Sequence, residues 1–153
     1  MTNSPTIHAI IFDMDGVLAF QPYLLSTLGE ILLARGDVDA AEKNFSEALA
    51  MSERLSIPER LAGLTANLGL VAQRRGETAL AIHRLSTALA RAEALNLKHL
   101  SAQIRVWLAP LLPINEARTH LAEARSIAEG SGRKRLLAEI EAASQRIEST
   151  NQR

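Results

Sequence analysis

The chain has 153 residues, of which 47% are apolar but only 3% aromatic, so its core must be built from Leu, Ala and Ile. Such a core suits closely packed helices better than a β-sandwich or barrel, which would need more Val, Tyr, Phe and Thr. Seventeen basic and seventeen acidic side chains cancel and cysteine is absent, which argues against nucleic-acid or membrane partners and excludes disulfides and thiol chemistry.

Apolar runs such as residues 9–12 are far too short to span a bilayer. No basic segment followed by a long apolar stretch indicates a secretory signal. With the absence of cysteine, these features predict a cytoplasmic protein.

The N-terminal part, residues 1–21, is interpreted as an extension in front of the helical region. Its segment Ile7–Phe12 is apolar and partly β-branched, and Asp13-Met-Asp-Gly16 follows it directly. This pattern predicts a short buried strand that ends in a turn, and it is the only strand-like segment of the sequence. Pro22 then fits the first turn of a helix.

From residue 24 the sequence repeats itself after forty residues. Of the thirty-two positions from 24 to 55, twelve are identical to the residue forty positions later. A fixed period of this size is typical of solenoids, in which each unit buries its apolar face against its neighbours. Apolar spacing predicts helices over residues 23–35, 38–55, 58–75 and 78–95.

Local signals are expected to start and stop these helices. Gly36 and Gly76 supply a left-handed position after the first and third helices, and Asp37 can cap the second. The segment Ser56-Ile-Pro-Glu59 has the spacing of a capping box in front of the third helix.

A degraded third copy is predicted over the C-terminal third of the chain. Its first helix spans residues 97–109, Pro110 and Pro113 replace the glycine turn, and Asn115 is the expected cap of the next helix. That helix ends near Gly130-Ser-Gly132. A last amphipathic helix, 134–148, would cover the end of the stack, followed by a charged tail at 149–153.

Few residues outside this pattern suggest chemistry. The four histidines are far apart and never form an i, i+4 pair with a flanking Glu, so a zinc site is not expected. Trp107, the only tryptophan, is predicted to pack in the core rather than carry a ligand. The basic cluster Arg133-Lys134-Arg135 reads as a solvated helix start.

The order of residues within each unit resembles the tetratricopeptide repeat. The pattern reads Leu25, Leu28-Gly29, Leu32, Gly36, Ala41, Phe45, Ala48 in the first unit, and Leu68-Gly69, Gly76, Ala81, Leu85, Ala88 in the second. Small residues would lie where two helices cross closely, with Leu28 and Phe45 filling the space between them. Covering residues 22–148, the resemblance implies an all-α, right-handed superhelical stack of antiparallel helix hairpins with forty-residue units and a C-terminal capping helix.

The resemblance also implies a protein-interaction module without catalysis or cofactor. Such repeats bind a peptide or protein surface in a concave groove lined by the first helix of each unit. Carried over to this chain, the groove positions are Tyr23, Ser26, Glu30, Leu33, Gly63, Ala66, Leu70, Gln73 and Arg74. The alternative, that these are ordinary solvent-facing helix positions, stays open.

A second resemblance points to a different class of protein. Residues 7–18 resemble the opening motif of haloacid-dehalogenase-type hydrolases, in which Asp13 would be the nucleophile toward a phosphoryl group and Asp15 a general acid/base, both near Mg²⁺. The helical repeats leave no chain for the parallel sheet that such a site needs. An isolated Asp-x-Asp binds Mg²⁺ only weakly, because magnesium keeps its waters.

Three interpretations of residues 7–18 follow. The favoured one is an inactive fragment of a hydrolase start; the others are a strand that completes a site with another chain, and a chance likeness in an apolar segment. The alternative function is accordingly an Mg-dependent phosphatase that uses Asp13.

The end of the stack at Tyr23 carries no obvious polar cap. Either the apolar N-terminal segment covers this end or a second subunit does, which predicts a homodimer or a missing part of a larger protein.

Overall fold

The computed structural model describes residues 21–151, and this part of the chain is all-α, as predicted. Its helices are α2 (Gln21–Ala34), α3 (Val38–Arg54), α4 (Pro58–Arg74), α5 (Thr78–Ala94), α6 (Lys98–Leu108), the 3-10 turn η2 (Ala109–Leu111), α7 (Ile114–Gly130) and α8 (Lys134–Asn151). None of these helices has the length and apolar character needed to cross a membrane. The predicted strand at residues 7–12 lies outside the described part.

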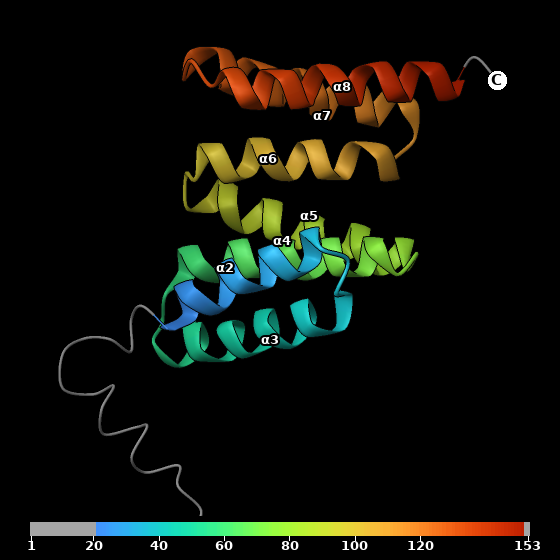
Figure 1. Ribbon diagram of the computed structural model, residues 1–153. Helices are drawn as coiled ribbons and strands as arrows, with labels where there is room; N and C mark the ends of the chain where they lie inside the picture. Colours follow the sequence, from blue (N-terminus) through green and yellow to red (C-terminus); the bar gives the residue numbers. More distant parts are fainter. Residues whose placement is uncertain (1–20, 152–153) are drawn as a thin grey trace, which may run out of the picture.

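Consecutive helices pack as antiparallel pairs, so the molecule is a stack that runs from α2 and α3 at one end to α7 and α8 at the other (Figure 1). A second set of contacts links alternate helices: α2 touches α4, α4 touches α6, and α6 touches α8. Between α3, α5 and α7 no comparable contacts occur within residues 21–151. The even-numbered helices therefore form the inner row of the stack.

Four turns between these helices share one backbone conformation at intervals of twenty residues. Each contains a residue with positive φ: Gly36 (86°), Ser56 (52°), Gly76 (76°) and Asn96 (54°). After each, the next amide donates to a carbonyl five residues earlier, as Asp37 N does to Leu32 O at 3.0 Å. The forty-residue unit thus consists of two helix-and-turn halves that end in the same way.

This geometry corrects the predicted capping box. Ser56 takes the left-handed turn position, so Ile57 precedes α4 and no side chain caps that helix. The prediction for Asp37 is confirmed, because its Oδ1 accepts from Ala40 N at 3.2 Å. Asn115 is not a cap: α7 begins one residue earlier, behind Pro113.

Of the two remaining boundaries, one agrees with the sequence prediction and one does not. The proline-rich turn after α6 is present as η2 followed by the extended residue Leu112. In contrast, α8 continues to Asn151, beyond its predicted end at Glu148.

Within residues 21–151, the core consists of three apolar clusters along the stack. Phe45 of α3 and Leu85 of α5, which are equivalent in the two units, are both fully buried. The third cluster joins α6, α7 and α8 around Leu121 and Ile140. Leu28, however, does not fill the core as predicted: it is 46% exposed, because no helix within residues 21–151 covers its side of α2.

Ser52 is a weak point in this core. Its side chain is completely buried, and Oγ has no hydrogen-bond partner among the described residues. Ala92 occupies the equivalent position of the second unit. We expect Ser52→Ala to raise the free energy of unfolding by about 1 kcal/mol, because a buried, unpaired hydroxyl is removed. Urea denaturation would measure the change, and a loss of stability would contradict this account.

Candidate functional site

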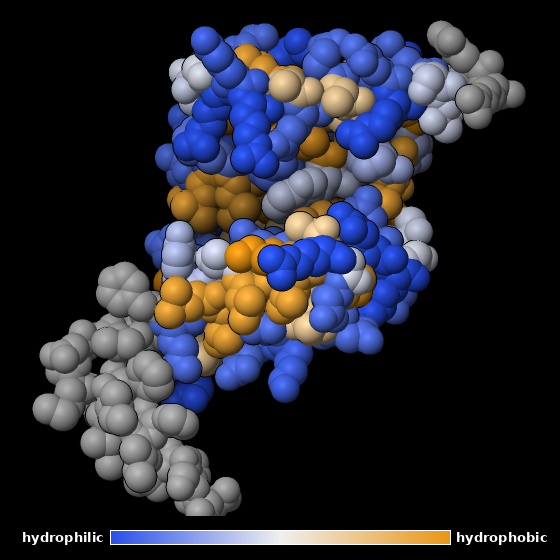
Figure 2. All heavy atoms as spheres, in the orientation of Figure 1, coloured by the Kyte–Doolittle hydropathy of each residue, from blue (hydrophilic) through white to orange (hydrophobic). Residues whose placement is uncertain are grey.

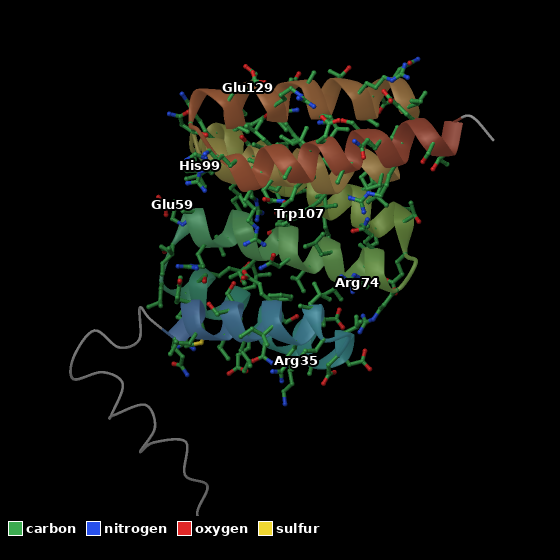
Figure 3. All side chains as sticks on the ribbon, turned by 45° about the horizontal axis from the view of Figure 1, so that its top comes forward. Arg35, Glu59, Arg74, His99, Trp107 and Glu129 are labelled. Atoms are coloured by element: carbon green, nitrogen blue, oxygen red, sulfur yellow. The ribbon has the colours of Figure 1, made fainter. Side chains whose placement is uncertain are left out.

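A hollow in the stack lies beside Trp107, on the inner row of helices. It has a volume of about 630 Å³, within the range of ligand sites, and is open to solvent. Its lining is mostly apolar and comes from α4, α6, η2, the start of α7 and α8: Gln73, Val106, Trp107, Ala109, Pro110, Leu112, Ile114, Glu139, Ala142, Ala143, Arg146, Ile147 and Thr150. Figure 3 places Trp107 between α8 and α4.

A second hollow of about 600 Å³ is also bordered by Trp107. Its lining is more polar: His99, Gln103, Trp107, Arg133, Lys134, Arg135, Leu136 and Glu139. Trp107 and Glu139 border both hollows, so the two adjoin along α6 and α8, and we call them together the Trp107 groove. It is apolar beside η2 and basic at the start of α8.

The charge of the Trp107 groove differs from that of the whole chain. Its lining contains four cationic side chains, Arg133, Lys134, Arg135 and Arg146, against one carboxylate, Glu139. That carboxylate is already held from two sides, by Gln103 Nε2 at 2.9 Å and Arg135 Nε at 3.2 Å. A chain of zero net charge therefore carries a net basic groove.

Trp107 has a dual environment. It is half-buried and packs against the cluster formed by α4, α5 and α6, as the sequence predicted. Its remaining surface faces both hollows. The sequence alone does not indicate this second role, because Gln73, Trp107 and Arg146 meet only through the packing of α4, α6 and α8.

The groove positions carried over from the resemblance lie elsewhere, mainly along α2 and α4. Burial removes Ser26, Leu33 and Ala66 from the available surface, because these side chains are 6%, 6% and 0% exposed where the helices pack together. Gly63 and Leu70 are half-buried, and Arg74 is exposed. Of the nine positions, only Gln73 lines the Trp107 groove.

The remaining two positions bridge α2 and α4. Glu30 accepts a hydrogen bond from Asn67 Nδ2 at 3.2 Å. The guanidinium of Arg60 stacks over the ring of Tyr23, 4.7 Å from its centroid, an attractive cation–π geometry. These contacts join the first helices of the two units.

The comparison with known families supports the repeat pattern. A family model described as tetratricopeptide repeat matches residues 21–94, which span α2 to α5. Residues 21–94 are tetratricopeptide repeats. No curated protein and no solved structure matches the chain. Asp13 and Asp15 lie before the matched region and outside the described residues, and no finding supports a hydrolase motif there.

Behind the matched tetratricopeptide repeats, α6 is tied to its neighbours by a charged cluster around Arg105. The guanidinium pairs with Glu93 of α5 at 2.5 Å and with Glu123 of α7. It also donates to Nδ1 of His120 on α7, at 3.0 Å. Burial, followed by the nearby charge of Arg105, lowers the pKa of His120 below its ordinary value of 6.5.

This arrangement predicts a stability that falls in acid. In the unfolded chain His120 takes up a proton at its ordinary pKa, whereas in the folded protein it does so only at a lower pH. Between these two pKa values the unfolded state binds more protons, so the free energy of unfolding decreases as the pH is lowered. We expect the melting temperature to drop as the pH decreases from about 6.5 toward the lower pKa of the folded state. His120→Gln should flatten this dependence, whereas His83→Gln, at an exposed position on α5, should leave it unchanged. An unaltered slope in the His120 variant would refute the assignment.

Proposed function

We propose that this protein is an interaction module that binds an apolar, acid-flanked segment of a partner protein in the Trp107 groove. Tetratricopeptide repeats are in general protein-interaction modules. The observation that carries the proposal is the groove itself: it is open, has an apolar floor and presents the only tryptophan of the chain. Aromatic side chains in such positions contribute most of the binding energy at many interfaces.

The chemistry of the lining defines the partner segment. Apolar side chains beside Trp107 would bury their surface against η2 and α8, where removal from water favours binding. The cations at the start of α8 and at Arg146 favour carboxylates on either side of that apolar centre. Helix geometry places Arg135 and Arg146 about 16 Å apart along α8, which five extended residues span.

The test uses the intrinsic fluorescence of Trp107 and the full chain. Three peptides share the centre Leu-Phe-Leu-Ala and carry two Glu, two Gln or two Lys at each end. We expect saturable changes in emission, with the Glu peptide bound most tightly and the Lys peptide least. Added salt should reduce this difference, because exposed charges are screened.

Matched variants on α8 separate the apolar centre from the charged end. Ala142 is exposed and lines the groove, whereas Ala138 is exposed one turn earlier and lines neither hollow. Ala142→Glu should weaken all three peptides and Ala138→Glu none. Lys134→Glu should weaken the Glu peptide alone, with Lys43→Glu on α3 as its control. The proposal fails if no peptide alters the emission, or if the two alanine variants behave alike.

A further inference from the structure

One face of α2 is apolar and exposed, although the same face of α4 is buried. Leu24, Leu28 and Ile31 are 63%, 46% and 46% exposed. Forty residues later, Leu64, Leu68 and Val71 occupy the equivalent positions and are 0%, 7% and 0% exposed. Figure 2 shows the resulting apolar patch over α2. We call Leu24, Leu28 and Ile31 the α2 face.

The second unit shows what kind of element covers such a face. Leu64, Leu68 and Val71 belong to one cluster with Ala41, Phe45 and Ala48 of α3. Those three residues form a stripe in which a large side chain stands between two small ones, and Phe45 of this stripe also reaches Gly29 of α2, so the stripe lies between α2 and α4. A helix with this stripe is therefore complementary to the α2 face.

An independent electrostatic observation gives the orientation of the missing helix. Arg75, directly after α4, pairs with Asp39 and Glu42 in the first turns of α3, both at 2.7 Å. Arg35 occupies the equivalent position directly after α2. It takes part in none of the ion pairs between residues 21–151. Arg35 is exposed and lies at the edge of the stack (Figure 3). It is thus placed to receive acidic residues at the start of a helix that lies as α3 does.

We infer that the α2 face binds an amphipathic helix of a partner protein, with acidic residues in its first turns and a small–large–small stripe spaced as Ala41, Phe45 and Ala48 are. This helix lies on α2 as α3 lies on α4. The surface is separate from the Trp107 groove, because none of its three residues lines either hollow.

The experiment uses a synthetic peptide with the sequence of α3 as the probe, added to the full chain. The peptide has the sequence of residues 38–54, and a lactam between Lys43 and Glu47 holds it helical. Both lactam residues are exposed, one helical turn apart, and outside the stripe. With a fluorescent label on the peptide, anisotropy should show saturable 1:1 binding to the full chain. A peptide carrying Phe45→Glu should not bind.

Variants of the protein locate the binding surface. Leu28→Glu should weaken the peptide at least about tenfold, because a carboxylate would be buried in an apolar contact. Leu80→Glu is the matched control, since Leu80 is 37% exposed on α5 and far from the α2 face in sequence. Arg35→Glu should also weaken binding, and a peptide with Asp39→Lys and Glu42→Lys should restore it.

Three results would overturn the inference. One is a peptide affinity that Leu28→Glu leaves unchanged, as expected if the peptide displaces α3 within the chain. Another is binding only after residues 1–20 are deleted, which would mean that the chain's own N-terminal segment occupies the face. The third is a dimer in light scattering that Leu28→Glu dissociates, with no peptide bound, which would assign the face to a second copy.

Discussion

Replacing Gly29 with Ala is expected to lower the free energy of unfolding by about 1–3 kcal/mol, although Ala is the better helix former. A Cβ atom on Gly29 would lie 2.5 Å from Cε1 and 2.7 Å from Cδ1 of Phe45. The ring of Phe45 is fully buried, so it cannot move aside without disturbing its neighbours. Gly69 repeats the arrangement, with its added Cβ 2.8 Å from Cγ of Leu85, and Gly69→Ala should be similarly harmful.

Gly63→Ala is the matched control within the repeats. Gly63 also lies inside a helix, α4, but a Cβ there meets no atom within 4 Å. This variant should gain about 0.5–1 kcal/mol from helix propensity alone. Urea denaturation followed by circular dichroism would measure all three variants. Equal changes in the free energy of unfolding for Gly29→Ala and Gly63→Ala would contradict the close packing of Phe45 against Gly29.

Leu85→Ala is expected to cost about 2–5 kcal/mol, a large part of the about 5–15 kcal/mol that stabilises a typical domain. Leu85 is fully buried between α4, α5 and α6, and its truncation leaves a cavity that the rigid helix pairs cannot close. Thermal unfolding should show a markedly lower melting temperature, with the far-ultraviolet signal of the folded state preserved.

Leu80, one and a half turns earlier on α5, provides the comparison for Leu85. It is 37% exposed, and Leu80→Ala should change the free energy of unfolding by less than about 1 kcal/mol. Equal losses at the two positions would mean that α5 is not packed as described.

The architecture was readable from the sequence because its determinants are local or periodic. Gly36 and Gly76 mark left-handed turns, Asp37 caps α3, and the recurrence of apolar positions after forty residues predicts stacked helices. The predicted helices over residues 23–95 were correct to within a few residues. Ser56 was misread for a physical reason: serine suits both a cap and a turn, and the spacing to Glu59 favoured the cap.

The burial of side chains at equivalent positions of the two repeats could not be predicted from the sequence in the same way. Leu28 and Leu68 are the same residue at the same place in the repeat, yet one is 46% and the other 7% exposed. The difference arises entirely from the helix that lies in front, α3 in the case of α4. A residue's own sequence context does not contain that neighbour.

The candidate site, like the burial of Leu28, depends on neighbouring helices that the local sequence does not specify. The sequence by itself determined a helical stack, its turns and most of its core, because helix periodicity and turn chemistry act over a few residues. Only the tertiary structure decided that Gln73, Trp107, Glu139 and Arg146 share one groove and that the cations of α8 gather beside it. These contacts depend on how far one helix is displaced and rotated against the next. That geometry results from the packing of all the side chains between them, and no single motif encodes it.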